Sequence, residues 1–489
     1  MRTFRFSLRT AVAIALPTLL AGCAVGPDFK KPAPPEVKAY QPGPQPELSG
    51  SQRFLLGKDV EARWWTQFGS KAIDDLVDEA FKHNPDLEAA KAALRVAQET
   101  VLAQKGAFFP TVGAGLNPTR QRIAGTLASP AASGRMYYNL HTAQVNISYT
   151  PDIFGSNRRQ VESLEAQAEG QKCELDAAYI SLASNVVLAA IGEAGLRAQI
   201  AATRAIIDTQ VKTLASYRRQ LELGQVARLD VAAQEAALAQ AEATLPPLDA
   251  QLSQQRDLIA ALVGKYPDET IAAQFELGAI QLPRELPVSL PSKLVEQRPD
   301  VREAETQLHS ASAAVGVTIA ARLPSITLTA SGGSAATDFS NMFKHGTLFW
   351  NLAANITQPI FQGGTLLHNQ RAAEAAYDQA AAQYRSTVIS AFQNVADTLH
   401  AIRTDADAES AAAKADQAAA RTLAITQKLQ TLGNVSYLAL LSAEQAQQQA
   451  RMALIQAQAA RLSDSVALFQ ALGGGWWNRT ETVAAGNPR

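Results

Sequence analysis

Cysteine is nearly absent from this chain of 489 residues, which contains only Cys23 and Cys173. Two cysteines cannot form a disulfide framework, and the six histidines are scattered without the spacing of a zinc site. The sequence also lacks a phosphate-binding loop and a nucleophile elbow. We therefore expect no enzymatic activity, no metal and no dissociable cofactor.

An excess of charge of either sign is also missing, because 44 basic residues are balanced by 45 acidic ones. This balance excludes the basic surface that nucleic-acid binding requires. Long hydrophobic runs are equally scarce, since no run of about 18 apolar residues follows Leu20. We therefore expect no membrane-spanning helix in the mature chain. If the protein crosses a membrane, it must do so with strands.

Residues 1–22 have the pattern of a secretory signal peptide, with three arginines ahead of an apolar stretch from Ala11 to Leu20. The tetrapeptide Leu20-Ala-Gly-Cys23 resembles a bacterial lipoprotein processing box, which predicts a covalent lipid on the Cys23 thiolate. An ordinary cleavage site beside an unmodified cysteine is the alternative. Lipoproteins retained at the inner membrane usually carry aspartate after the cysteine. Because Ala24 stands there, we expect a lipid-anchored protein of the outer membrane.

The remainder of the chain contains two similar halves, in which short motifs recur in the same order at a spacing of about 210 residues. The recurring pairs are Asn84-Pro85 and Arg298-Pro299, Pro110 and Pro324, Ile153-Phe154 and Ile360-Phe361, Leu223-Gly224 and Leu432-Gly433, and Leu262 and Leu472. Duplication of one structural unit explains this order. We expect the following domains: a lipidated tether at 23–62, a first repeat at 63–264, a connector at 265–298, a second repeat at 299–477 and a tail at 478–489.

Each half predicts a helix, then two strands, then a long helical hairpin. The expected first helices are 70–107 and 299–322, each closed by a proline. The expected strands, identified by period-two alternation, are 111–116, 141–154, 325–331 and 348–361. The expected hairpins pair helix 158–223 with 229–262 and helix 366–432 with 438–472. Gly224 and Gly433 break these hairpins, and Pro246-Pro247 predicts a kink in the first return helix.

Other segments carry simpler predictions. The connector from Gly264 to Arg298 contains four prolines and is predicted to be irregular, and the Pro-rich residues 25–50 are predicted to form an extended tether. Cys173 is interpreted as a small buried residue. The acidic residues near position 407 (Asp405, Asp407 and Glu409) lie in an Ala-rich helix and are interpreted as a solvated face.

Four strands per chain cannot form a closed barrel, yet strands in a bilayer must close so that no edge is left unpaired. Known outer-membrane barrels contain at least about eight strands. Three chains would supply about 12 strands, continued by twelve helices. Aromatic residues near the strand ends, among them Tyr149, Phe154 and Trp350, fit an interfacial girdle. The alternative for these aromatics is packing in a soluble sheet.

Several motifs distributed over nearly the whole mature chain resemble the TolC-like outer membrane factor family, and in particular its NodT-type lipoprotein branch. They include Cys23-Ala-Val-Gly-Pro-Asp-Phe29, Trp64-Trp65, Thr150-Pro-Asp-Ile-Phe-Gly155, Arg298-Pro-Asp-Val-Arg302, Ala314-Val-Gly-Val317 and Ala471-Leu-Gly-Gly-Gly-Trp476. The resemblance implies a mainly α protein with membrane strands, in which three copies share a 12-stranded β-barrel and a long 12-helix periplasmic α-barrel. It also implies an efflux or export channel that docks to a periplasmic adaptor and an inner-membrane pump.

The same resemblance places the periplasmic tips at the two glycine breaks. The residues that would contact the adaptor are Gly224, Gln225, Val226 and Ala227 in the first repeat, and Gly433, Asn434, Val435 and Ser436 in the second. The closed gate would involve a ring of Asp230 carboxylates, which attracts cations, and a hydrophobic ring of Leu438. Arg228 could pair with Asp230, while Ala439 and Ser442 stand where the family often has acidic residues. A helix N-terminal carboxylate is the simpler interpretation of Asp230.

Two other classes of envelope protein contain long helices. A periplasmic adaptor lipoprotein usually has one hairpin flanked by small β-domains, whereas this chain has two repeats with strand pairs. A structural coiled-coil lipoprotein would show heptad regularity, which is absent here. The passive outer-membrane conduit is therefore the leading hypothesis.

Overall fold

The computed structural model describes residues 24–37, 39–43, 48–122, 124, 136–269 and 271–479. The predicted signal peptide and the predicted lipid on Cys23 lie outside these residues, as do positions 480–489 of the predicted tail. The chain forms two compact units. Unit 1 comprises residues 1–32, 94–170 and 304–384, and unit 2 comprises 33–93, 171–303 and 385–489. Each unit therefore contains parts of both repeats.

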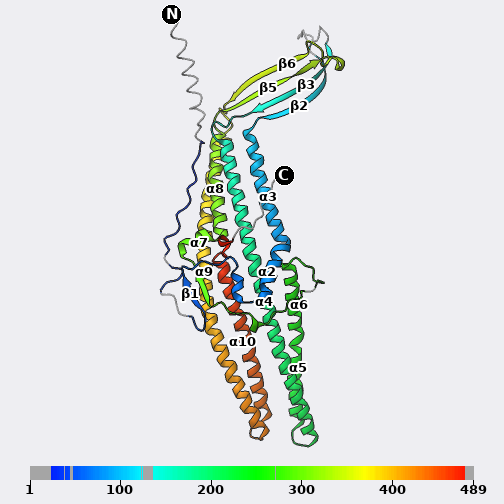
Figure 1. The fold of residues 1–489 in the computed structure, drawn as a ribbon, viewed down its shortest axis with the longest axis vertical. Helices are drawn as coiled ribbons and strands as arrows, with labels where there is room; N and C mark the ends of the chain where they lie inside the picture. Colours follow the sequence, from blue (N-terminus) through cyan, green and yellow to red (C-terminus); the bar gives the residue numbers. More distant parts are fainter. Residues whose placement is uncertain are drawn as a thin grey trace. The chain divides into compact units, whose positions relative to one another are not determined.

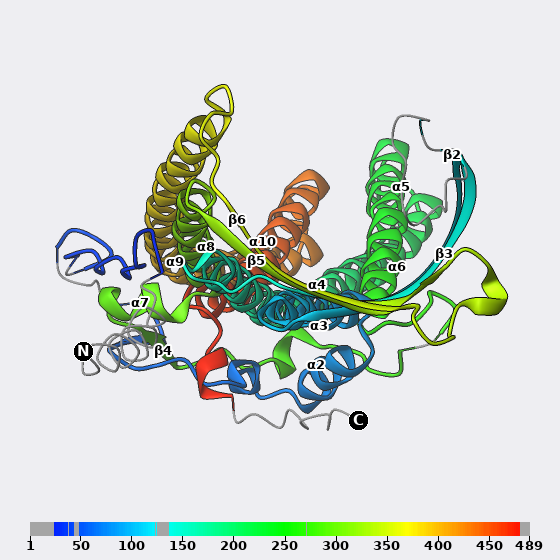
Figure 2. The same ribbon diagram turned by 90° about the horizontal axis from the view of Figure 1, so that it is seen from above.

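Unit 1 contains a four-stranded antiparallel sheet in the order β2-β3-β5-β6 (Figures 1 and 2). The strands are β2 (Thr111–Arg122), β3 (Tyr137–Tyr149), β5 (Ser325–Ala336) and β6 (Leu348–Thr357). The central pair, β3 and β5, joins the two repeats, with Val145 opposite Gly332. At Gly333 a Cβ atom would lie 2.2 Å from the Ala143 carbonyl oxygen, so this close pairing requires glycine.

The two faces of this sheet differ in polarity. Directly paired residues share a face, and one row reads Val112, Ile147, Ala330 and Leu352 across the four strands. Further members of this apolar face are Leu116, Val145, Leu328, Trp350 and Ile356, all of them large and exposed. The opposite face carries the row Gly113, Asn146, Ser331 and Asn351. Apolar side chains therefore alternate with glycine and polar residues over one part of the sheet, whereas Arg120, His141 and Ser334 lie on the apolar face toward its other end.

All four strands were predicted, but their bounds differ from the prediction. β2 and β5 extend beyond the predicted ends at 116 and 331, because ladder pairing continues through polar residues such as Thr119 and Ser334. β3 and β6 end before the predicted 154 and 361, at Tyr149 and Thr357. The strand ends therefore follow the loss of ladder partners and not the polarity of the residues.

The predicted long hairpins are present. α4 (Ser156–Glu222) and α9 (Thr365–Thr431) each contain 67 residues, which at about 1.5 Å per residue is roughly 100 Å. The return helix of the second repeat is α10 (Tyr437–Ala471). In the first repeat, the predicted kink is a break that divides the return helix into α5 (Arg228–Ala243) and α6 (Leu245–Leu262) (Figure 1). Prolines occupy the first turn of α6. Backbone N–H groups in a first turn have no hydrogen-bond partner within the helix, so the N–H that proline lacks is not needed there.

The predicted first helix at 70–107 is instead two helices, α2 (Lys71–His83) and α3 (Pro85–Lys105). Asn84 lies between them with extended backbone, as expected for a residue before proline. Its side-chain oxygen accepts the Leu87 N–H at 3.0 Å and so caps α3. A proline that permits a helix start therefore also forces the preceding helix to end.

The second repeat has the same arrangement, which makes the predicted irregular connector at 264–298 wrong in part. It contains β4 (Glu285–Val288) and α7 (Pro291–Gln297). Arg298 is extended between α7 and α8 (Pro299–Ala320), as Asn84 is between α2 and α3. β4 pairs in parallel with β1 (Arg53–Leu56). A short amphipathic helix surrounded by prolines is difficult to distinguish from a loop in sequence.

The core of unit 2 is aromatic. Trp64 and Phe68 from the 3-10 helix η1 (Trp64–Phe68) and Phe469 from α10 are fully buried. The Trp64 and Phe469 rings stack with centroids 5.1 Å apart, and Phe68 meets Phe469 edge to face. The Trp476 indole donates to the Gln297 carbonyl at 2.6 Å. These contacts join the start of the first repeat to the end of the second.

The N-terminal segment is extended, but it is not a free tether over its described residues. In unit 1, the buried Arg159 guanidinium donates to the carbonyls of Val25 and Gly26 at 3.1 and 3.3 Å, and to Asp28 at 2.7 Å. The Phe29 ring stacks on His309 at 4.3 Å. In unit 2, the Tyr40 hydroxyl donates to the Ser289 carbonyl. Proline content predicted the extended backbone, whereas the partners come from distant helices.

The interpretation of the acidic residues near position 407 as a solvated face was incorrect in part. Asp407 is exposed, as interpreted, and accepts from Ser49 at 2.6 Å. Asp405 and Glu409 are half-buried, and Glu409 accepts from the buried Arg461 at 2.6 Å. Burial, followed by the neighbouring Asp405 carboxyl, raises the pKa of Asp464 to about 6. The expectation of no membrane-spanning helix stays a prediction, because α4 contains one 18-residue window of mean hydropathy 1.5 that could cross a membrane by length and composition alone. Half of that window is buried within the structure, as in the core helix of a globular unit.

Candidate functional site

The tips of the two hairpins, both in unit 2, have the same backbone geometry. The N–H groups of Gly224 and Gln225 donate to the Leu221 and Gln220 carbonyls, both at 2.9 Å. Gly433 and Asn434 repeat this pattern on α9. These pairs form Schellman motifs, which require a left-handed residue, and φ is +72° at Gly224 and +77° at Gly433. The glycines that the sequence marked as helix breaks therefore set the shape of both tips.

The return helices begin with different caps. In the first repeat, Asp230 Oδ2 accepts the Ala227 N–H at 3.0 Å, so the carboxylate does cap the helix. In the second repeat, Ser436 Oγ accepts the Ala439 N–H at 3.4 Å. Among the described residues no ion pair joins Arg228 to Asp230, and Arg228 is exposed. Ser442 is also exposed, one turn beyond the second cap.

Exposed leucines surround both tips. Leu438, which the sequence analysis placed at the gate, has 64% of its surface exposed. Leu229 holds the corresponding place after the first tip and is 77% exposed, and Leu223 and Leu432 precede the two glycines with 65% and 71% exposed. Leu229 was not among the expected gate residues, although the repeat spacing makes it the counterpart of Leu438. Each tip therefore presents two large apolar side chains without cover in the single chain.

A small buried cluster behind the tips connects the two hairpins. Its members are Leu214 and Tyr217 of α4, Val231 of α5 and Tyr437 of α10. The two tyrosine rings lie 4.7 Å apart. Sequence analysis did not find this cluster, because single tyrosines in long helices give no signal without their partners. This cluster packs the two hairpins against each other close to the expected gate residues.

Polar groups complete this cluster. The Tyr437 hydroxyl donates to the Gln234 side-chain oxygen, and Gln430 Nε2 donates to the Tyr217 hydroxyl at 2.9 Å. Gln234 is fully buried and donates in turn to the Gln210 carbonyl at 3.3 Å. Burial, with smaller effects from Glu444 and other neighbouring charges, raises the pKa of Tyr437 to about 12. The hydroxyl therefore keeps its proton, and the hydrogen bond, at physiological pH.

The chain is similar to known proteins over most of its length. A family model described as outer membrane efflux protein matches residues 76–265 and 290–474. The chain is similar to the probable efflux pump outer membrane protein TtgC of Pseudomonas putida, with 29% identity over 464 residues and 94% of both chains covered. The matched ranges cover most of the two expected repeats, and the second range begins within the expected connector.

Solved structures show the same fold. The outer-membrane channel OprN superposes with a TM-score of 0.83 at 26% identity, covering 93% of this chain and all of the other. The open state of the MtrE outer membrane channel of Neisseria gonorrhoeae gives 0.80 at 27% identity, covering 94% of this chain and all of the other. The fold is therefore that of the TolC-like outer membrane channels, as the sequence motifs predicted.

The cluster behind the tips can be tested with Tyr437→Phe. This substitution leaves the buried Gln234 oxygen without its donor, which costs about 1–3 kcal/mol. Hydrogen exchange of the tip amides of Gly433 and Asn434 should accelerate about tenfold. Tyr266→Phe is the control, since Tyr266 is 75% exposed in the same unit. Equal exchange in both variants would show that this contact does not hold the tips.

Proposed function

We propose that this chain, which belongs to the outer membrane efflux protein family, forms a passive conduit as one of three identical subunits. Membership makes it the outer-membrane channel component of an efflux pump, located in the outer membrane and extending into the periplasm. The trimer, its gate and its partners are the new elements of the proposal. No catalysis is required of it, because the energy for transport comes from the pump.

The sheet of unit 1 carries the argument for the trimer. Within the described chain, β2 and β6 are edge strands that pair on one side only. One face of the sheet is apolar and fits lipid, so open edges would leave backbone groups unpaired in hydrocarbon. Two copies would supply about eight strands, which close around an interior filled by side chains. Three copies supply about 12 strands and leave a lumen, lined by the polar face.

The proposal extends to the helices. Large apolar residues remain exposed on them in the single chain, at positions spread along their lengths. Ile389 is 69%, Ile425 59%, Leu258 47% and Val211 46% exposed. Twelve long helices from three copies would cover them and continue the barrel as a tunnel.

The tips are proposed as the adaptor contact and the gate. The first tip offers Gly224, Gln225, Val226 and Ala227, and the second offers Gly433, Asn434, Val435 and Ser436. Both have a fixed backbone and lie at the ends of hairpins, where an adaptor helix tip can reach them. Rings of Leu438 and of the corresponding Leu229 would form the hydrophobic constriction. Asp230 would add negative charge, with Arg228 and Ser442 beside the aperture.

The domain division is proposed as well. The repeats at 63–264 and 299–477 would be the products of duplication, and each supplies one strand pair and one hairpin. A lipid on Cys23 would hold the N-terminal segment at the membrane. That role is consistent with the contacts of Val25, Gly26 and Asp28 with Arg159, which hold the residues after the lipid against unit 1.

The native mass of the full-length protein, extracted from outer membranes in mild detergent, tests the trimer. We expect the mass of three mature chains, each bearing acyl groups. Cys23→Ser should remove the acyl mass but leave the threefold mass, because the barrel closes through strand pairing. A lipidated monomer would contradict the proposal and would favour an adaptor or a tethered coiled coil.

The gate is tested by ion selectivity in planar bilayers. Asp230→Asn keeps an oxygen that can cap α5 but removes the charge, so the cation-to-anion permeability ratio should fall at least about twofold. Ser436→Ala is the matched control, because it removes the cap of α10 without changing charge. If both variants change the ratio equally, or neither does, Asp230 does not act through its charge at the aperture.

A further inference from the structure

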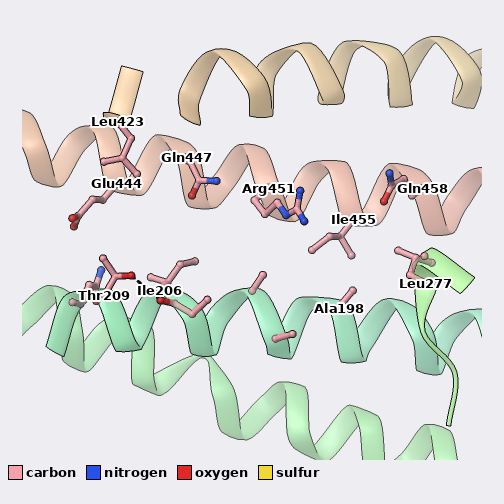
Figure 3. Close-up of a pocket in the computed structure, with 15 residues that line it drawn as sticks. Ala198, Ile206, Thr209, Leu277, Leu423, Glu444, Gln447, Arg451, Ile455 and Gln458 are labelled. Atoms are coloured by element: carbon pink, nitrogen blue, oxygen red, sulfur yellow. Dashed lines mark hydrogen bonds between the residues drawn. The ribbon is translucent and has the colours of Figure 1, made fainter. Parts of the chain in front are cut away.

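Unit 2 contains a cavity of about 620 Å³ between α4 and α10, within the range typical of small-molecule sites. Figure 3 shows Glu444 near one end and Leu277 near the other, with residues of α10 facing Ala198, Ile206 and Thr209 of α4 across the space. Four alanines on α4, with Ile206, Leu423 and Ile455, make the walls mainly apolar. No tip residue lines this cavity, although the Gln210 carbonyl also accepts from Gln234 of the cluster behind the tips.

Two buried acceptors at this cavity have no hydrogen-bond partner. Glu444 on α10 is 9% exposed, and its Oε2 atom is unpaired. Gln210 on α4 is 4% exposed, and its Oε1 atom is unpaired as well. Both residues line the cavity. A buried carboxylate without a partner is costly, and a donor that entered the cavity would remove that cost.

The charges around the cavity determine which donor fits. Arg451 is the one basic residue among the lining side chains, and its guanidinium is held by Asp416 at 3.4 Å. Gln447 also donates to Asp416, at 3.5 Å. Glu444 is thus left without a cation, and the lining together with Asp416 carries one net negative charge. Burial raises the pKa of the Glu444 carboxyl, the direction expected for an acid lacking a counter-ion.

We propose that this cavity binds an organic cation that has an ammonium group and an apolar body, with the ammonium donating to Glu444 and Gln210. The apolar body lies against the alanines of α4 and against Ile455. This site is lined by residues of a single chain. Burial is the main cause that raises the pKa of Tyr217 and Tyr437, and the Glu444 charge raises it further, so an occupant paired with Glu444 would change the field at the cluster behind the tips.

The experiment titrates dansylcadaverine, a fluorescent naphthalene bearing an alkylammonium group, into the purified full-length oligomer in nonionic detergent. We expect saturable binding that is at least about tenfold weaker for Glu444→Gln. Dansyl amide, which has the same ring system without the ammonium, should also bind at least about tenfold more weakly to the unmodified protein. Glu242→Gln removes an exposed carboxylate of α5 and should leave the affinity unchanged.

Ala202→Phe fills the wall of the cavity without altering charge, and it should abolish saturable binding while the native mass is retained. Glu444→Gln should unfold no earlier than the unmodified protein without ligand, because it removes a buried unpaired charge. That result separates loss of a ligand contact from loss of the fold. Equal affinity of the unmodified protein and Glu444→Gln, full binding by Ala202→Phe, or the absence of saturation would each overturn the proposal.

Discussion

The requirement that every backbone hydrogen-bonding group be paired in hydrocarbon is the constraint on which the rest of this structure depends. The chain supplies four strands with an apolar face, and its edge strands β2 and β6 have partners on one side only. A sheet of this kind is stable in a bilayer only when copies of the chain close it. In the proposed trimer, three copies close the sheet, and the helices that leave the strands continue it as one wall. The Ala-rich sequence of α4 and α9, which allows close approach of neighbouring helices, is suited to that wall.

The proposed duplication explains how one chain supplies two strand pairs to this sheet. Each repeat contributes a strand pair and a hairpin, and β3 and β5 join the two pairs in the centre of the sheet. The repeats are not exact copies at their tips. Asp230 caps the first return helix and Ser436 caps the second, so only the first tip carries a capping carboxylate. The buried pair Tyr217 and Tyr437 then couples the two hairpins just behind their tips.

Much of the architecture could be predicted from sequence because the signals are local. Glycine at a left-handed turn, proline at a helix start and alternation along strands are each written in a few adjacent residues. Features that depend on distant partners could not be predicted in this way. Arg159 holding Val25, Arg461 holding Glu409, and the tip tyrosines all give ordinary side chains roles that appear only after folding. The break at Asn84 was missed because the expected helix 70–107 runs through Pro85, although a proline disfavours helical backbone at the residue before it.

The orientation of the sheet in the membrane tests the central claim most directly. Spin labels on single cysteines introduced at Leu352, on the apolar face, and at Asn351, on the polar face, can be probed with oxygen, which concentrates in lipid, and with a water-soluble nickel complex. The buried Cys173 should remain unlabelled. A closed barrel predicts a label at position 352 that is accessible to oxygen and a label at position 351 that is accessible to nickel. Equal access of nickel to both positions would contradict a lipid-facing sheet and the shared barrel derived from it.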